Sequence, residues 1–357
     1  MSTSETALVG GEFELRVEDL ALDGRRANEL PRFGAPFESW FDTGRSALAV
    51  AARDILQRGG QSTVWLPAYV CDAVVAPFRQ QGFAIRYYGV GPDLVAVDAA
   101  PAPGDTLLFI HYFGHRNRGA LARVGQWRAA SVRVIEDCAQ AGLTEGVGTH
   151  GDYAVSSLRK LLPVPDGALL ASRLPVASEA GASDEEFISA KIAGKLLRGA
   201  RGPAEIYLRL FEHAECRLDA ASPRHLSWLS GQLLRNADLG LAAARRRRNW
   251  SSLRAALAGS PKLRGLSPLF HELDPGDVPL GFPVRVGHGQ RDALRRHLAS
   301  REIYCAVHWA LDHVPGEFEN ERGLSGSLLT LPSDQRYDSA DMERLVEALQ
   351  SFPGDLR

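Results

Sequence analysis

Lysine is rare in this chain, and one lysine lies in an apolar stretch where a merely solubilising charge is not expected. The chain has 41 lysine and arginine residues, but lysine occurs only at positions 160, 191, 195 and 262. A lysine amine can lose its proton and form a Schiff base or carry protons, whereas an arginine guanidinium stays protonated. Lys160 is therefore a candidate amine nucleophile, and the alternative is an incidental surface lysine.

A candidate carboxylate partner is Asp137, which ends the apolar run from Val132 to Asp137 that is typical of a buried strand. A carboxylate held there in low dielectric can pair with a protonated ring nitrogen and keep that nitrogen charged. The alternative is that Asp137 only caps the turn after the strand.

A candidate anion site lies at the start of an expected helix, at Gly44, Arg45 and Ser46. The free backbone amides of a helix N-terminus, with the Arg45 and Ser46 side chains, can hold a phosphate. An ordinary helix start is the alternative. Ser157, three residues before Lys160, would add a hydroxyl donor. An amine, a ring-facing carboxylate and a phosphate site are together the groups that hold pyridoxal phosphate.

The elements that must position these residues form an α/β pattern. Helices are expected at 44–57 and 73–81, and strands at 63–66, 84–88, 106–111, 132–137, 153–157 and 168–172. This alternation predicts an α/β fold with a mostly parallel sheet. Because ligands bind at the carboxyl ends of such strands, His111 and Asp137 are expected at the site, with Lys160 near the same edge.

Three regions are expected along the chain: an N-terminal arm at 1–40, a large domain at 41–235 and a small C-terminal α+β domain at 236–357. A change of composition at about 175–221 predicts a variable, partly mobile insertion with helices at 184–197 and 204–218. A long helix is expected at 233–257, and further elements of the small domain at 281–286, 290–300, 303–307 and 339–351.

Charge and cysteine content exclude several classes of protein. The formal net charge is −2, so no global field favours nucleic acid or an anionic membrane. The basic run from Arg245 to Arg248 is interpreted as a solvated helix face or a subunit contact. The four cysteines form no CxxC pair, so neither a metal site nor a disulfide framework is expected. We find no signal segment and no membrane-length apolar run, so the expected compartment is the cytoplasm.

Taken in order, the motifs of the chain resemble the DegT/StrS-type aminotransferases, which are pyridoxal phosphate enzymes of fold type I. The resemblance spans roughly residues 40 to 350 and rests on Gly44 to Leu48, Leu66 to Tyr69, His111 to Gly114, Ile135 to Ala141, Gly151 and Asp152, Ser157 to Lys160, and Pro165 to Gly167. It implies a large cofactor-binding domain followed by a smaller one.

The resemblance also assigns roles to residues. It implies that Lys160 forms the internal aldimine with pyridoxal phosphate, that Asp137 contacts the pyridine nitrogen, and that Gln140 hydrogen-bonds the phenolic oxygen of the ring. It further implies a phosphate site made of Gly44, Arg45, Ser46 and Ser157.

In this family the active site lies at a homodimer interface. The stretch Pro223 to Gln232, with Arg248 to Trp250, is similar to the region that reaches the partner's cofactor. Arg224 and Asn249 are therefore the candidate residues for contact with the partner subunit.

The chain departs from the family pattern in two places. Cys71, a candidate cofactor contact, stands where the family usually has an aromatic residue stacked on the cofactor ring. We expect Tyr69, His111 or Tyr112 to take over the stacking, and the alternative is that the ring is covered less tightly. The turn from Val164 to Ala168 replaces the glycine-rich turn common in the sugar aminotransferases. Both changes weaken the expectation of a sugar substrate.

The small domain supplies candidate substrate contacts, namely His308, Trp309 and Arg336. Arg336 could bind a substrate carboxylate through both edges of its guanidinium, and the alternative is a structural ion pair with Asp334 or Asp338.

The sequence as a whole predicts an aminotransferase that moves an amino group from an amino acid, expected to be glutamate, to a keto acceptor. A ketosugar nucleotide and a small ketone of secondary metabolism are both open as acceptors. Two other hypotheses remain: a pyridoxal phosphate enzyme of another type, such as a lyase or replacement enzyme, and a non-catalytic relic of the fold.

Overall fold

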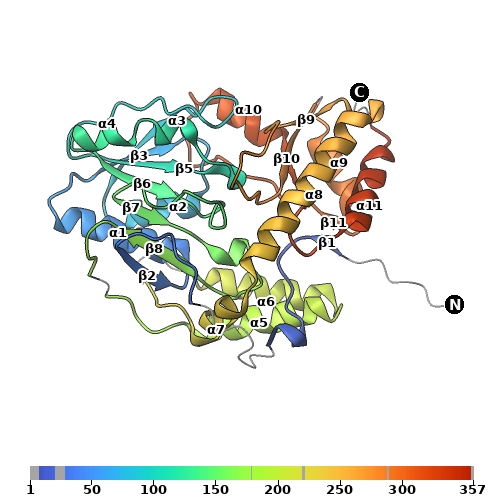
Figure 1. Cartoon of the computed structure of the whole chain (residues 1–357), viewed down its shortest axis with the longest axis horizontal. Helices are drawn as coiled ribbons and strands as arrows, with labels where there is room; N and C mark the ends of the chain where they lie inside the picture. Colours follow the sequence, from blue (N-terminus) through green and yellow to red (C-terminus); the bar gives the residue numbers. More distant parts are fainter. Residues whose placement is uncertain (1–7, 21–28, 178, 219–221, 288, 355–357) are drawn as a thin grey trace.

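The computed structural model describes residues 8–20, 29–177, 179–218, 222–287 and 289–354. Its main feature is a seven-stranded sheet of order β2-β8-β7-β6-β5-β3-β4 (Figure 1). The strands are β2 (Phe37–Phe41), β3 (Thr63–Pro67), β4 (Ala84–Tyr88), β5 (Thr106–Ile110), β6 (Arg133–Asp137), β7 (Tyr153–Val155) and β8 (Ala168–Ser172). The five from β4 to β7 in this order pair in parallel, whereas β8 and β2 pair antiparallel. The predicted α/β fold with a mostly parallel sheet is confirmed.

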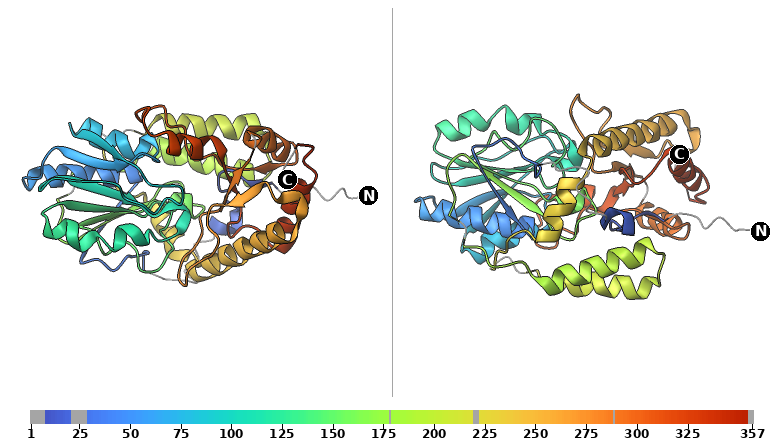
Figure 2. Two further views of the ribbon diagram at one scale, coloured as in Figure 1. Left: turned by 90° about the horizontal axis from the view of Figure 1, so that it is seen from above. Right: turned by 60° about the horizontal axis from the view of Figure 1, so that its bottom comes forward.

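Helices cover both faces of this sheet (Figure 2). Helices α1 (Gly44–Gln57) and α2 (Asp72–Gln80) lie on one face, and α3 (Arg118–Leu121) and α4 (Val124–Ala129) lie on the other. Thr43 begins α1, because its side chain accepts a hydrogen bond from the amide of Ser46. The largest apolar core of the described residues lies between the buried faces of these helices and the strands of the sheet.

A second, smaller core forms around an antiparallel sheet of order β12-β10-β9. Its strands are β9 (Leu266–Pro268), β10 (Phe282–Val286) and β12 (Leu328–Leu331), and its helices are α8 (Leu239–Gly259), α9 (Arg291–Ala299), α10 (Glu319–Ser327) and α11 (Ser339–Gln350). The limits of the two domains remain a prediction.

Two expectations about the chain path are corrected. The predicted limit of the N-terminal arm at residue 40 falls inside β2, which pairs with β8, while β1 (Val9–Gly10) pairs in parallel with β11 (Ile303–Tyr304). The long helix expected at 233–257 is two helices, α7 (Trp228–Asn236) and α8. Asp238 separates them, because its side chain accepts the amide of Leu241 and caps α8.

The expected insertion is a helical hairpin of α5 (Glu185–Gly199) and α6 (Ala204–Cys216), which packs beside the N-terminal segment (Figure 1). Its two helices match the predicted ones to within a few residues. The described residues also form four short 3₁₀ helices: η1 (Val17–Leu20), η2 (Tyr112–Gly114), η3 (Leu158–Lys160) and η4 (Pro261–Leu263). Among the described helices, none is long and apolar enough to cross a lipid bilayer.

Candidate active site

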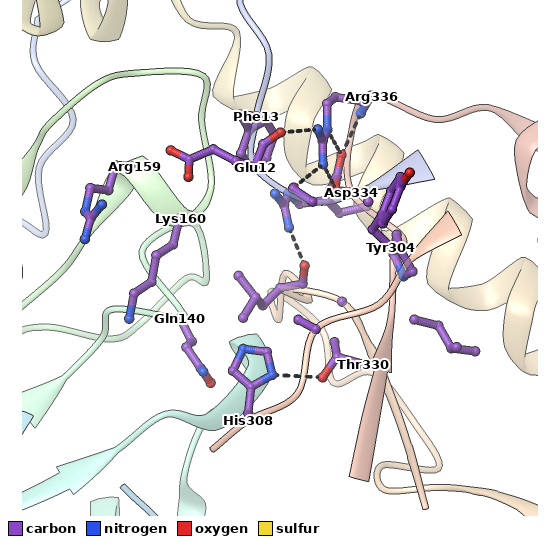
Figure 3. A pocket seen from close by; sticks show the side chains of 18 of the residues that line it. Glu12, Phe13, Gln140, Arg159, Lys160, Tyr304, His308, Thr330, Asp334 and Arg336 are labelled. Atoms are coloured by element: carbon purple, nitrogen blue, oxygen red, sulfur yellow. Dashed lines mark hydrogen bonds and ion pairs between the residues drawn. The ribbon is translucent and has the colours of Figure 1, made fainter. Parts of the chain in front are cut away.

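Lys160 lies in η3, between the antiparallel strands β7 and β8, and its side chain enters a pocket of about 330 Å³. The lining comes from the N-terminal segment, from residues of the large domain such as Gln140, and from residues of the small domain such as His308, so parts far apart in the sequence meet there. In the part of the chain that the structure describes, no hydrogen bond or ion pair ends on the Lys160 amine. Figure 3 shows the amine pointing toward Gln140, with His308 on the far side. A free amine in a pocket suits a nucleophile or proton carrier.

Asp137 ends β6, and the residue is 4% exposed. Its Oδ1 atom accepts the amide of Ala139 at 2.8 Å. Burial raises the pKa of Asp137, and the positive charge of Lys160 opposes that rise. A cationic ring nitrogen placed against this carboxylate would stabilise its charged form in the same way.

Gln140 is 2% exposed and has a fixed orientation. Its Oε1 atom accepts the backbone amide of Phe113 at 2.6 Å. Because a backbone amide can only donate, the amide nitrogen of Gln140 is left to donate elsewhere. The residue can therefore offer a hydrogen bond to an oxygen bound in the pocket.

At the predicted phosphate site, the first turn of α1 lies against the residues that precede Lys160. A β-carbon built on Gly44 would lie 3.9 Å from Cβ of Ser157, so the two residues are neighbours. Ser157 is buried, and the hydroxyl of Ser156 is buried without a partner among the described atoms. The first-turn amides of Gly44 and Arg45 have no intrahelical acceptor. These donors fit a phosphate group.

Ser46 and Arg45 differ from the expectation in detail. The amide and hydroxyl of Ser46 both lie 3.3 Å from the Thr43 hydroxyl, so its side chain is already engaged. The guanidinium of Arg45 turns toward Glu215 of α6, at 3.9 Å. The Oδ1 atom of Asp42 accepts the amide of Thr43 at 2.6 Å, and burial raises the pKa of the Asp42 carboxyl group.

His111 does not cover the cofactor site, and this part of the prediction is wrong. Its Nε2 atom lies 3.3 Å from Glu136, and its Nδ1 atom accepts the amide of Asn117 at 2.9 Å. Successive side chains of a strand point to opposite faces, so Glu136 and Asp137 lie on opposite sides of β6. His111 is fully buried on the Glu136 side.

His111, Glu136 and Cys138 bring possible metal-ligand atoms within 4.8 Å of one another. The carboxylate of Glu136 already accepts the amides of Gly148 and Gly151, at 2.8 and 2.6 Å. These bonds anchor the loop before β7, which is a structural use of the same side chains.

Aromatic side chains near Lys160 come from both domains. Tyr69 is buried against Tyr112 and Trp309, with ring centroids 5.9 and 5.4 Å apart, and its hydroxyl donates to the main-chain oxygen of His308. Tyr112 donates to the main-chain oxygen of Tyr69 at 2.6 Å. Cys71, which precedes α2, is only partly buried. Tyr69 and Tyr112 remain the predicted residues that cover a bound ring.

His308 and Trp309 line the pocket, as their predicted substrate role requires. The Nδ1 atom of His308 lies 3.0 Å from the Thr330 hydroxyl. Burial, assisted by the charge of Lys160, lowers the pKa of His308 to about 4. The imidazole is therefore neutral near pH 7 and can exchange hydrogen bonds without adding a charge.

Arg336 also lines the pocket, but its guanidinium is fully engaged. Asp334 accepts from its Nε and Nη2 atoms at 2.9 Å each, and Glu14 accepts from Nη1 at 2.7 Å. The structural ion pair, which the sequence left open as the alternative to a substrate-binding role, is the arrangement found.

The two candidate partner contacts differ. The prediction for Asn249 is wrong, because this residue is 1% exposed and donates to the main-chain oxygens of Asp334 and Tyr337. Arg224 has a side chain that is 38% exposed and lies 3.7 Å from Asp184. Its contact with a partner stays a prediction.

Sequence reasoning missed Arg246, which is fully buried although the basic run around it was interpreted as a solvated face or a subunit contact. It donates to the main-chain oxygens of Leu161, Pro279 and Leu280 and so ties the loop after Lys160 to the small domain. Burial lowers its pKa to about 10. Helical spacing was the available signal, because Ala242, Arg246, Trp250 and Leu253 share one buried face of α8. The pocket lining also includes Glu12, Phe13 and Arg159, which were not singled out.

Solved structures resemble this arrangement over nearly its whole length. The aminotransferase TlmJ from Streptoalloteichus hindustanus has a TM-score of 0.68 at 18% identity, covering 97% of this chain and 98% of that one. The sugar aminotransferase CalS13 from Micromonospora echinospora has a TM-score of 0.67 at 18% identity, covering 96% and 100%. A DegT DnrJ EryC1 StrS aminotransferase from Brucella abortus has a TM-score of 0.61 at 16% identity, covering 94% of each chain.

These likenesses establish the fold: the chain has the fold of these aminotransferases. No protein-family model matches the chain, and no curated protein sequence matches it. What the site does therefore rests on its own residues.

Proposed function

We propose that the protein is a pyridoxal phosphate-dependent aminotransferase of the DegT/StrS type. The observation that carries the proposal is the unpaired Lys160 amine, which shares one pocket with Gln140 and lies near enough to Asp137 to oppose its pKa rise. The first turn of α1 and Ser157 would hold the phosphate. When bound, this cofactor supplies a conjugated ring that withdraws electrons from the α-carbon of an amino acid.

Each residue then has a defined task. Asp137 keeps the ring nitrogen protonated, because a buried carboxylate is stabilised by a cation beside it. The amide nitrogen of Gln140 donates to the phenolic oxygen of the ring. Lys160 would take the proton from the α-carbon of the amino donor and return it to the C4′ atom of the cofactor, two atoms away, which requires a neutral amine within reach of both positions. Tyr69 and Tyr112 limit the access of water.

The substrates and the assembly belong to the same proposal. Sugar aminotransferases are among the structures with this fold, which supports a sugar-type keto acceptor, with glutamate as the amino donor. A homodimer with a shared site is supported by the side chain of Trp228, which is 72% exposed in the segment expected to meet a partner. A cytoplasmic location agrees with four unpaired cysteines.

The first experiment is to mix the purified protein with pyridoxal phosphate, reduce it with borohydride and locate the modified residue by mass spectrometry. We expect the label on Lys160, and no such label in Lys160→Ala. Lys262→Ala is the matched control, because Lys262 is exposed and distant in the sequence. A protein that shows no absorbance band after the cofactor is added would instead be a non-catalytic relic.

A second measurement separates aminotransfer from other chemistry on the same cofactor. Glutamate should be converted to 2-oxoglutarate in one equivalent per site in the absence of acceptor, and catalytically when a suitable keto sugar is added. A lyase would release no 2-oxoglutarate. A panel of amino acids and of keto acceptors, with and without a nucleotide, then identifies the substrates.

A further inference from the structure

One carboxylate of the helical hairpin joins three basic side chains that have no role in the steps above. Glu215 of α6 has its Oε1 atom 2.7 Å from Nη1 of Arg159 and 2.8 Å from Nζ of Lys191. Its Oε2 atom lies 3.9 Å from Nη1 of Arg45. The hairpin thereby contacts both the first turn of α1 and the residue that precedes Lys160.

Arg159 is only partly satisfied by this contact. Its Nη1 atom is bound to Glu215, but its Nε atom is buried without a partner among the described residues. The side chain lines the same pocket as Lys160, and Figure 3 shows the two side by side. A buried donor on a charged group is costly to leave unpaired. An acceptor that enters the pocket would remove that cost.

The ionic cluster has more positive than negative charge. Glu12 lies 3.0 Å from Lys191 and 3.3 Å from Lys195, and these contacts complete a network with Glu215. Arg45, Arg159, Lys191 and Lys195 face the two carboxylates, an excess of two formal positive charges, or of one if Asp42 is included. Although burial alone would raise it, the charges of Arg159 and Lys191 hold the pKa of Glu215 at about 2. The carboxylate is therefore ionised near neutral pH.

The position of the cluster identifies the anion that it suits. Arg159 follows Ser157 by two residues, and Ser157 is the neighbour of Gly44 at the start of α1. Arg45 lies in the same first turn. A phosphate monoester carries about −1.5 to −2 charges near pH 7, which is opposite in sign to the excess of one or two positive charges and similar to it in size.

We propose that Arg159 binds the phosphate of the cofactor through its free edge, and that Glu215, itself held by Lys191, is the positioning residue that orients Arg159. The proposal rests on the proposed function, and it gives the α5–α6 hairpin a task in cofactor retention. Guanidinium and phosphate form charge-assisted bonds of fixed geometry, so an arginine held at one end is well placed to bind with the other.

The test compares the dissociation constants of pyridoxal phosphate and pyridoxal, which lacks the phosphate, by absorbance titration of the full-length protein. Arg159→Ala should weaken binding of the phosphorylated form by about 10- to 100-fold, the range expected for a hydrogen bond to a charged group, and leave pyridoxal unchanged. Arg159→Lys should recover part of the loss. Inorganic phosphate should compete with pyridoxal phosphate in wild type and less well in Arg159→Ala. Arg209→Ala on the exposed face of α6 is the control.

Glu215→Gln tests the positioning role, because its two possible effects have opposite signs. Removing a negative charge from the cluster should tighten phosphate binding if Glu215 acts only through the local potential. We expect weaker binding, by about 3- to 10-fold, because Arg159 loses its anchor and a charge-assisted bond. Glu212→Gln, an exposed change on the same helix, should have no effect. Tighter binding in Glu215→Gln would overturn the positioning role.

Three other outcomes are decisive. An equal loss of affinity for both compounds in Arg159→Ala would mean general damage to the pocket and would overturn the inference. Unchanged cofactor binding with a weaker affinity for the amino donor would assign Arg159 to a substrate carboxylate instead. If wild type binds no pyridoxal phosphate at all, the proposed function itself fails, which is distinguishable from either result.

Discussion

Asp334 accepts hydrogen bonds from both Nε and Nη2 of Arg336, at 2.9 Å each, so the pair is a closed fork between a carboxylate and a guanidinium. The remaining amino group of Arg336 reaches Glu14 and the main-chain oxygen of Glu12. The arginine thus fastens the N-terminal segment to the small domain beside the pocket.

Breaking this buried pair should destabilise the fold. Arg336→Ala leaves the Asp334 carboxylate without its partner, and the expected loss in the free energy of unfolding is about 3–5 kcal/mol. Urea denaturation followed by circular dichroism measures it. Arg295→Ala, an exposed change on α9, should cost much less. Normal stability of Arg336→Ala with a raised Michaelis constant for the donor would show that Arg336 binds substrate after all.

Asp137 should matter for the reaction more than for holding the cofactor. In Asp137→Asn the side chain keeps its shape but loses the charge that favours a protonated ring nitrogen, and the rate of the glutamate half-reaction should fall about 100-fold or more. Stopped-flow absorbance with a fixed cofactor load gives this rate. Asp312→Asn, on the exposed surface, serves as the reference. An unaltered rate in Asp137→Asn would remove Asp137 from the mechanism.

Trp228 should stabilise the proposed dimer. An exposed tryptophan is among the residues that contribute most to protein interfaces, so Trp228→Ser should weaken dimerisation by roughly 30-fold or more. Sedimentation velocity over a concentration series measures the dissociation constant. Leu208→Ser changes an exposed apolar residue of the hairpin, 57% exposed, and should leave the dimer intact. A wild-type protein that is monomeric at all concentrations would contradict the dimer.

His115 should make stability depend on pH. Burial lowers its pKa to about 3 from the ordinary 6.5, so the unfolded chain binds the proton more readily between these values. The contribution of His115 to the stability of the fold is therefore fully present above pH 6.5 and is lost as the pH falls toward 3. The ring stacks on Phe270 at 3.8 Å, so His115→Phe should keep the packing.

The melting temperature between pH 7 and 5 measures the effect of His115. His115→Phe should lose less stability on acidification than wild type does. His271→Asn alters an exposed histidine, and its profile should follow that of wild type. Parallel profiles for wild type and His115→Phe would show that His115 binds its proton equally well in the folded and unfolded chains, and so that burial does not lower its pKa.

Much of the framework follows from local sequence patterns. The apolar runs before His111 and Asp137 predicted β5 and β6 to within a residue or two, and the helix predicted at 44–57 is α1 with the same limits. Lys160 was found through the rarity of lysine and the short spacing to Ser157. Such signals lie within a few residues of one another, where backbone periodicity and capping decide the structure.

Side-chain direction was harder to predict. His111 ends the expected strand, yet its ring lies on the face of the sheet opposite Asp137, because its Nε2 atom contacts the carboxylate of Glu136 on that face. Arg246 belongs to a basic run, but its side chain is buried and donates hydrogen bonds to three main-chain oxygens. In both cases a partner from another element determined the outcome.

The sequence by itself determined the order of strands and helices and the residues capable of cofactor chemistry, because these depend on local periodicity and on residue type. Only the tertiary structure decided which charges meet. Arg159 and Glu215 are 56 residues apart, and Arg336 and Glu14 are 322 apart. No local pattern encodes such pairs, since each forms only after packing has brought its two elements together and removed the water between them.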